Sequence, residues 1–421
     1  MIVTAAGQQE PMMELDYTHV DGRLTEIASS ENVEGGVRVA TYTYGYLANA
    51  NLPESVLSNN GVADVLTLSR TYDDAGGLLS IAGTVGGAVP AAISSFTYGL
   101  DARGRRVSRT DLDGSRFDYS YNNRDELVGA VRSNPPAAAP FGEYPYSYAY
   151  EFDRIGNHLR QVKNGTEFRG RYDAVNALLE RSVLGVVRVQ GETEGVLPIG
   201  VTVDGRAAET QDVAVDRTAF RGDSRPIAPG QTGEKAISIV ATDSNQPPRR
   251  TEAVRTVQLP AANPVRYAHD LNGNLISDGR WDCFWTTECR LAALQSAAHV
   301  PAPERRRIEF AYDGEGRRRW RKVLTWDALA EDWALAAETT FVYDGWNLVF
   351  ESTTDSQQQT TGTSYTWGLD LSGTIDGAGG VGGLLSITRR VATDVSNFVA
   401  YDGNGNVVAL VDADSGAVEA I

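Results

Sequence analysis

Apolar and polar residues alternate along much of this 421-residue chain, in short runs that end at glycine- or asparagine-rich turns. In Ser94–Tyr98 and Arg116–Tyr121 the aromatic residues occupy every second position, so they share one face of an extended strand. Near the C-terminus, Tyr401–Leu410 reads Y-D-G-N-G-N-V-V-A-L. Glycine and asparagine adopt positive φ cheaply, and aromatic and β-branched residues favour strands. This stretch therefore predicts a β-hairpin.

The same hairpin pattern recurs along the chain at a spacing of roughly 20 to 30 residues, which indicates a repeat architecture. Each copy has an aromatic residue, an acidic or amide residue, a Gly/Asn/Arg turn and then Leu or Val. The copies begin at Tyr17, Tyr72, Tyr98, Tyr121, Phe152, Tyr172, Tyr267, Tyr312, Tyr343 and Tyr401. A single hairpin is marginally stable in water, so we expect successive copies to pair with one another. The predicted fold class is all-β, with one long antiparallel sheet of hairpins.

This repeat resembles the YD repeats of Rhs proteins, a family that includes the C components of Tc toxins and the teneurin ectodomains. The most specific part is Tyr365–Leu385, which looks like the segment that precedes the core region of bacterial Rhs proteins. The resemblance implies that the sheet curls into part of a hollow β-cocoon. It also implies a structural role, in which the shell encapsulates and helps to deliver a C-terminal effector or toxin polypeptide. The family's self-cleavage motif, Asp-Pro-x-Gly-Leu, does not occur in this sequence, so neither a protease nor a toxin is assigned to these residues.

The repeat lapses between Tyr172 and Tyr267, where the composition changes. Phe220 is the only aromatic residue from 183 to 262, and short alternating runs there are separated by turn residues. These runs predict a small β-sandwich, whose order resembles bacterial Ig-like modules. We therefore expect three domains: a first YD/Rhs block at 1–182, an inserted Ig-like β-sandwich at 183–262, and a second block at 263–421 that leads toward an Rhs core absent from this sequence.

Charge and hydropathy limit the classes of partner that the chain is expected to bind. The formal net charge is −17, and a phosphate backbone requires a basic face, so nucleic acid is not an expected partner. No run of 18 apolar residues predicts a membrane span, and no signal peptide is visible at the start. We expect a bacterial protein that is secreted or on the cell surface, with this chain a fragment of a longer one. The alternative function is adhesion or glycan binding by the shell exterior and the insert, with surface glycans or proteins as partners.

No catalytic, cofactor or metal site is expected, although several motifs need weighing. Gly377–Gly382 matches G-x-G-x-x-G but precedes an apparent strand, whereas a dinucleotide site needs a helix there. Asp270–Asn274 and Asp402–Asn406 begin like calcium loops but lack the later Gly and Glu, so they are interpreted as Asn-Gly turns. Arg221–Ser224 reads R-G-D-S, a weak adhesion signal.

Three further interpretations concern local structure. Cys283 and Cys289 flank an enlarged turn, where a disulfide is possible in an oxidising compartment and metal binding is less favoured. The four tyrosines in Tyr144–Tyr150 lie on one face of a strand, which favours a core position over a sugar-binding platform. The stretch 292–307 has helical composition, which its prolines limit to a turn or two.

Overall fold

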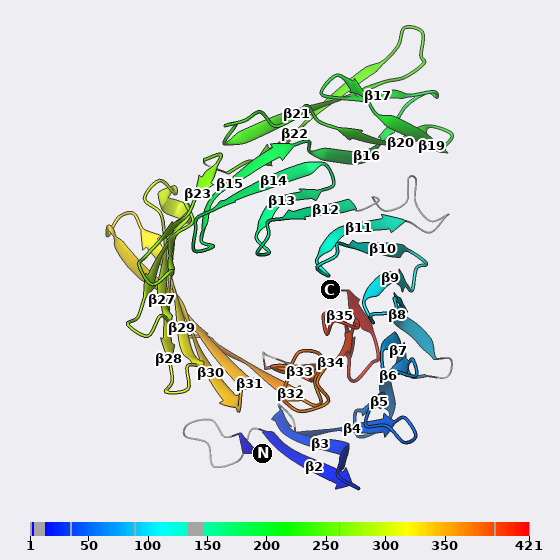
Figure 1. Cartoon of the computed structure of the whole chain (residues 1–421), viewed down its shortest axis with the longest axis vertical. Helices are drawn as coiled ribbons and strands as arrows, with labels where there is room; N and C mark the ends of the chain where they lie inside the picture. The colour runs from blue at the N-terminus through cyan, green and yellow to red at the C-terminus, as the bar shows by residue number, and fades with distance from the viewer. Residues whose placement is uncertain are drawn as a thin grey trace. The chain divides into compact units, whose positions relative to one another are not determined.

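The structure is a computed structural model that describes residues 2–3, 13–33, 36–87, 90–133, 147–260, 262–390 and 393–420. These residues form long antiparallel β-sheets, so the all-β prediction is confirmed (Figure 1). The one helical element in the described ranges is a 3-10 turn, η1 (Ala302–Glu304). The chain divides into two compact units: unit 1 comprises Met1–Leu112 with Pro301–Ile421, and unit 2 comprises Asp113–Val300.

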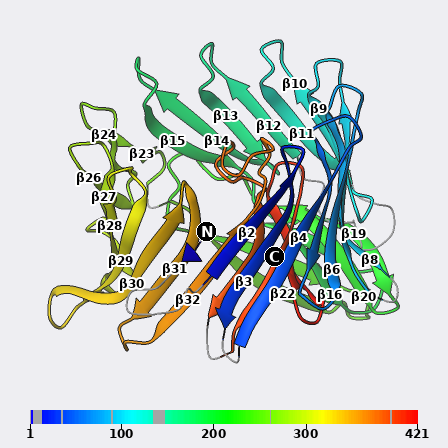
Figure 2. The ribbon, with the colours of Figure 1, turned by 90° about the horizontal axis from the view of Figure 1, so that it is seen from below.

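Unit 1 contains two runs of strands in which each strand pairs antiparallel with the next. The first run is β1 (Ile2–Val3), β2 (Met13–Val20), β3 (Arg23–Val33), β4 (Gly36–Tyr46), β5 (Pro53–Asn59), β6 (Asp64–Tyr72), β7 (Leu78–Val85), β8 (Ala91–Leu100) and β9 (Arg106–Asp111). The second is β28 (Arg306–Tyr312), β29 (Arg318–Asp327), β30 (Asp332–Asp344), β31 (Asn347–Asp355), β32 (Thr360–Trp367), β33 (Leu384–Arg390), β34 (Val395–Tyr401), β35 (Val407–Asp412) and β36 (Val418–Ala420). Figure 2 shows β2, β3 and β4 side by side.

The two runs of unit 1 pack against each other and share one hydrophobic core. Strand β34 lies against β7, and β35 lies against β8 (Figure 1). At the centre, the Tyr42 ring meets the Phe398 ring edge-on, with centroids 5.8 Å apart and planes at 87°. Both side chains are fully buried. Burial of such rings removes a large apolar area from water, and this stabilises the pairing of the two sheets.

Unit 2 contains a hairpin sheet, an insert and a short second group of hairpins. The first comprises β10 (Arg116–Tyr121), β11 (Leu127–Ser133), β12 (Ser147–Phe152), β13 (His158–Lys163), β14 (Thr166–Tyr172), β15 (Leu178–Gly185) and β23 (Val265–Arg266), which pairs with β15. The last comprises β24 (Ala268–His269), β25 (Leu275–Ser277), β26 (Trp281–Trp285) and β27 (Leu291–Ser296).

The insert between β15 and β23 forms two small sheets around a core of its own. One sheet has the order β16-β20-β19, with β16 (Arg188–Glu194), β20 (Arg217–Asp223) and β19 (Glu209–Ala214). The other has the order β18-β17-β21-β22, with β18 (Arg206–Ala207), β17 (Gly200–Val203), β21 (Glu234–Thr242) and β22 (Arg250–Gln258). Val203, Phe220 and Ile237 pack between them. The Ig-like assignment and the boundaries at 182 and 262 stay predictions.

All ten hairpins predicted from the repeat are present, and the acidic residue of the motif explains their turns. In eight of them an Asp or Asn side chain accepts the backbone N–H groups two and four residues later. Asp73, for example, accepts from Ala75 at 3.0 Å and from Gly77 at 2.6 Å. The other caps are Asp101, Asn122, Asp153, Asp173, Asp270, Asp313 and Asp402. The hairpins at Tyr17 and Tyr343 close instead with two-residue turns.

The aromatic residue of the motif has a second role, which the sequence did not reveal. In two of the ten copies, and at three other strand ends, an aromatic residue lies at a β-bulge near the end of its strand and donates a hydrogen bond to a backbone carbonyl near the start of the preceding strand. Tyr72 Oη donates to Pro53 O at 2.8 Å, and Trp367 Nε1 donates to Leu348 O at 2.6 Å. Tyr46, Trp285 and Tyr401 make the same bond. Because the acceptor lies outside the aromatic residue's own hairpin, we call this contact an aromatic stitch between repeats.

One local prediction was wrong in part. Within the stretch 292–307, residues up to Ser296 belong to strand β27, and the helical part is η1 alone. Tertiary pairing with β26 overrides the weak helical composition there.

Candidate functional site

The most distinctive surface in unit 2 is one face of β10–β15, which we call the aromatic face. Alternation places Phe117 and Tyr119 of β10, Tyr148, Tyr150 and Phe152 of β12, and Phe168 and Tyr172 of β14 on it, and the strand registers align these positions. All of these rings are half-buried. Neighbouring rings stack: Phe117 and Tyr119 lie 6.1 Å apart at 5°, and Tyr148 and Tyr150 lie 6.4 Å apart at 8°. The result is a set of aromatic rows on alternate strands, which remain partly open to solvent.

Basic side chains cover part of the aromatic face. Arg181 lies over the Phe168 ring with 4.5 Å between its guanidinium carbon and the ring centroid, and Lys163 lies 5.8 Å from the Tyr148 centroid. Beside them is a hollow of about 330 Å³ between Tyr150, Phe168 and Tyr172. Burial raises the pKa of both tyrosines that line it, so they remain neutral phenols at neutral pH. This face can therefore offer ring surfaces, hydroxyl groups and a few cations to a partner.

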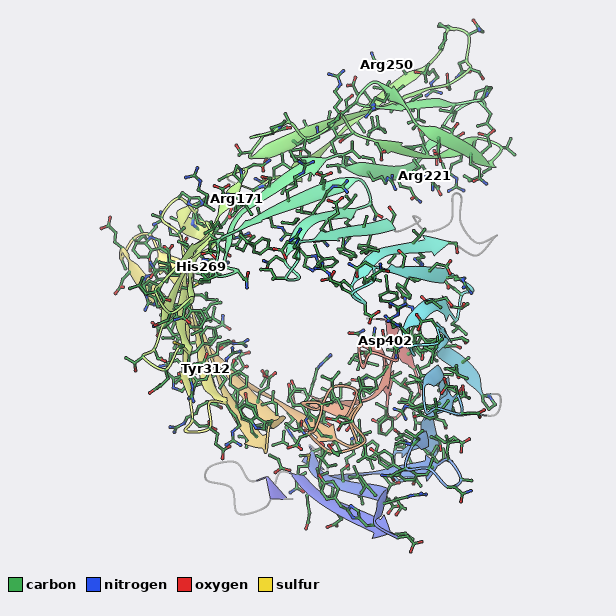
Figure 3. The ribbon with its side chains drawn as sticks, viewed as in Figure 1. Arg171, Arg221, Arg250, His269, Tyr312 and Asp402 are labelled. Atoms are coloured by element: carbon green, nitrogen blue, oxygen red, sulfur yellow. The ribbon has the colours of Figure 1, made fainter. Side chains whose placement is uncertain are left out.

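The opposite face of the same strands is charged. Arg160 of β13 pairs with Glu151 at 2.9 Å and with Glu167 at 3.0 Å, and Arg171 pairs with Glu180 at 3.0 Å. Arg171 is labelled in Figure 3. Surface ion pairs of this kind contribute little stability, but they keep a sheet face hydrated. The strands of unit 2 thus have one face suited to water and one suited to an apolar partner.

Unit 1 contains a polar contact between its two sheets, which we call the seam. Glu31 of β3 is 3% exposed and accepts a hydrogen bond from Ser364 Oγ at 3.2 Å, and its carboxylate lies 3.6 Å from the Arg390 guanidinium. Burial raises the pKa of the Glu31 carboxyl above its ordinary value, although hydrogen bonds and Arg390 act in the opposite direction. Nearby, Tyr42 Oη donates a hydrogen bond to Ser386 Oγ at 2.7 Å.

The cavity at the seam is small. It measures about 10 Å³ and lies between Glu31, Tyr42 and Ser386, which leaves room for about one water. At the rim, Arg38 makes a bidentate ion pair with Asp414, with distances of 2.7 and 2.8 Å. The seam is therefore built to hold two sheets together, and this particular cavity does not admit a substrate.

The two cysteines lie where the sequence placed them, around an enlarged turn. Cys283 is half-buried on β26, and Cys289 is exposed after it with φ 56°. Both are free thiols in this structure, so it does not contain the possible cross-link, which stays a prediction for an oxidising compartment. Burial, and then nearby carboxylates, raise the pKa of the Cys283 thiol.

In the glycine-rich and calcium-like motifs, the aspartate side chains accept hydrogen bonds from backbone N–H groups of their own loops. In the glycine-rich loop, Asp370 accepts the backbone N–H of Ala378 at 2.5 Å and of Gly380 at 3.2 Å, and strand β33 follows as expected. Asp402, which is labelled in Figure 3, accepts the backbone N–H groups of Asn404 and Asn406 in its own turn. Across the described residues, no group of three or more His, Cys, Asp or Glu side chains has a metal-binding arrangement.

The first three residues of the R-G-D-S stretch end strand β20, and Ser224 follows it directly. Arg221 pairs with Glu209, Asp223 pairs with Arg188 at 3.0 Å, and Ser224 is fully buried. Both charges of the tripeptide are therefore engaged within the insert. Of the predicted tyrosine stripe, Tyr144 and Tyr146 lie outside the described residues; Tyr148 and Tyr150 share one face as predicted, but they are half-buried and not core residues.

No protein-family model matches this chain, and no curated protein matches it. Among solved structures, the chain is similar to part of the crystal structure of TcdB2-TccC3-Cdc42, at 11% identity and a TM-score of 0.37 over 99% of this chain, and to part of that of TcdB2-TccC3, at 13% identity and a TM-score of 0.37 over 96%. A structure of the Photorhabdus luminescens Tc holotoxin pore gives 11% identity and a TM-score of 0.39 over 96%. This chain spans about one fifth of the length of each of those chains (21%, 20% and 19%). In the described part of the chain, no helix is long and apolar enough to cross a membrane.

Proposed function

We propose that this chain is a wall segment of a secreted or cell-surface protein shell, and that the aromatic face of β10–β15 contacts a polypeptide held by that shell. The observation that carries the proposal is the two-faced sheet of unit 2. Half-exposed rings gathered on one face mark an interaction surface, because a protein in water gains by covering them. The charged opposite face suits the outside of a wall.

The repeat chemistry supports the structural half of this proposal. Capped turns close the hairpins, backbone pairing joins one hairpin to the next, and aromatic stitches reinforce five of these junctions, so the wall extends by adding repeats and requires no catalytic residue. The enclosed partner is expected to be an unfolded or partly folded effector polypeptide that continues from the C-terminal side of the same protein. Its apolar side chains would lie on the aromatic face, and its backbone carbonyls would accept hydrogen bonds from the tyrosine hydroxyls.

The test is protease protection of the natural protein. The chain is produced with its natural C-terminal continuation, and the rate at which added protease digests that continuation is compared with the rate for the continuation alone. Slower digestion in the joined protein is expected. Replacing Tyr150 and Phe152 together by Ser should speed digestion, whereas Arg171→Ser on the charged face should not. Equal digestion rates in the joined and separate forms would end the proposal.

Adhesion is the second candidate, and one observation favours it. The insert has an open groove with an apolar floor, along two strand edges that no described strand covers, whereas its R-G-D-S stretch is engaged in internal ion pairs. For an adhesive role, we therefore expect the partner to contact this groove and not the R-G-D-S stretch.

A further inference from the structure

The insert sandwich is closed along one side by a strand that passes from one sheet to the other. β18 pairs with β17 in one sheet, and β19 pairs with β20 in the other, with only Ala208 between them. Ala208 itself donates its N–H to Val201 O at 2.9 Å. On this side the two sheets are joined continuously, and the core residues between them are covered.

The other side of the sandwich is open. There the outermost strands are β16 in one sheet and β22 in the other, and within the part of the chain that the structure describes each has a hydrogen-bonded neighbour on one side only. A groove of about 540 Å³ runs between them, with Phe220 and Ile239 in its floor and with Val189, Ala253 and Arg255 in its walls. One side of the sandwich is therefore closed and the other open, as in a β-sandwich that lacks one edge strand.

Backbone geometry shows which groups the open edges present. Val187 O accepts from Ser224, and Gly195 N–H donates to Asp216 O, so odd-numbered residues of this segment face β20. By alternation, the N–H and C=O groups of Gln190 and Glu192 point toward the open side. The same reasoning applies to β22, where Arg249 O accepts from Asp243 and the even-numbered residues have their backbone groups directed outward.

One charged side chain stands out on the groove wall. Arg255 lies at a position of the same parity as the half-buried Ala253 and Val257, so it belongs to the face of β22 that lines the groove. Among the described residues, no hydrogen bond or ion pair engages its guanidinium. Arg188, on the opposite wall, already pairs with Asp223. The groove is thus apolar along its floor and has one uncommitted positive charge.

We propose that this groove binds an extended β-strand of another polypeptide, whose inward side chains are apolar and alternate with outward polar ones, and which places one acidic inward side chain against Arg255. The added strand would take its main-chain hydrogen bonds from the open edge of β16 or β22. Its apolar side chains would cover Phe220 and Ile239. The proposal does not depend on the shell function, because the groove lies wholly within the insert.

The test uses the full chain and fluorescein-labelled peptides of about eight residues, a length that matches the seven residues of β16 at about 3.3 Å per residue. The probe alternates Val and Ser and carries Glu in place of one central Val. Two control peptides have the same composition in scrambled order, or Lys in place of Glu. Fluorescence polarisation should show binding of the probe at least about tenfold tighter than that of either control.

The matched variants are Arg255→Glu and Arg250→Glu, which make the same change on the groove face and on the outward face of one strand. Arg255→Glu should reverse the preference, so that the Lys peptide binds more tightly than the Glu peptide, while Arg250→Glu should leave the order unchanged. Unchanged amide exchange in β17 and β21 of both variants would show that the insert remains folded. Equal binding of alternating and scrambled peptides, no peptide binding, or an unreversed preference in Arg255→Glu would overturn the proposal; Arg255 would then be an inward charge that guards a free edge.

Discussion

Replacing Phe398 by Ala tests whether the two sheets of unit 1 form one cooperative core. The side chain is 1% exposed and packs edge-on against Tyr42. Loss of a buried Phe costs about 3–5 kcal/mol, because transfer energy and cavity formation add. About 0.5–1.5 kcal/mol of that reflects the ring pair itself. Since every 1.4 kcal/mol is a factor of ten in an equilibrium constant, local opening should become more frequent by a factor of about 140 to 3,700.

Amide hydrogen exchange is the suitable assay, because a chain of many repeats need not unfold in two states and a single melting temperature would blur the effect. We expect faster exchange in both β34, which contains Phe398, and β4, which contains Tyr42. The matched control is Phe284→Ala in unit 2, where the ring is 46% exposed, and it should leave exchange in β4 unchanged. If Phe398→Ala accelerates β34 but leaves β4 protected, the two sheets do not share a core and the reasoning fails.

Three further predictions concern single groups. Because burial raises the pKa of Glu31, its contribution to stability is fully present below the ordinary carboxyl pKa and is lost as pH rises through the raised value. Glu31→Gln should therefore flatten the pH dependence of the opening free energy of β3, measured by amide exchange corrected for intrinsic rates between about pH 4 and 8, and an unchanged slope would contradict this. Tyr72→Phe removes one aromatic stitch and should lower the local free energy of unfolding by about 0.5–1.5 kcal/mol. Amide exchange should become faster in the strand that begins at Pro53, and unchanged exchange there would contradict this prediction. Alkylation of the reduced protein should modify exposed Cys289 before Cys283, whose thiol is half-buried and has a raised pKa, and mass spectrometry of timed samples would show the reverse order if this is wrong.

The hairpins could be predicted from sequence because their causes are local. A carboxylate that caps the N–H groups two and four residues later needs only its own turn, and Gly at positive φ needs only its own backbone. The Tyr-Asp pair therefore identifies a turn wherever it occurs, at Tyr72 as at Tyr401. Four strands of the insert, β16, β17, β21 and β22, could also be predicted from alternation that persists without the aromatic residues, whereas β18, β19 and β20 were missed.

The packing of unit 1 could not be predicted, because its partners are far apart in the chain. Tyr42 and Ser386 are separated by 344 positions, and Tyr98 accepts the N–H of Gly403 across 305. No local pattern records which strand will lie opposite which. The seam is also rich in serine, threonine and a glutamate, residue types that alternation assigns to solvent. For that reason the burial of Glu31 could not be predicted from the sequence.

Alternation also tells which residues share a face without telling whether anything covers that face. It placed Tyr148 and Tyr150 together correctly, yet the core position expected for them was wrong, since both remain half-exposed. A tyrosine stripe has the same sequence whether the sheet has one layer or two. The tyrosine clusters of unit 1 became core because a second sheet packs on them, and those of unit 2 became a surface.

The acidic balance of the chain has a structural cause that its sequence concealed. Net charge suggested only which partners to exclude, but the capped turns show where seven of the 55 acidic residues act. Hydrogen bonds from Asn274 and from the backbone hold the pKa of Asp270 below its ordinary value, and Arg317 does the same for Asp313. A repeat that closes each turn with a carboxylate gains one negative charge per hairpin unless an arginine follows, as Arg317 does. A longer array of such hairpins would therefore become more acidic as it grows, whatever it binds.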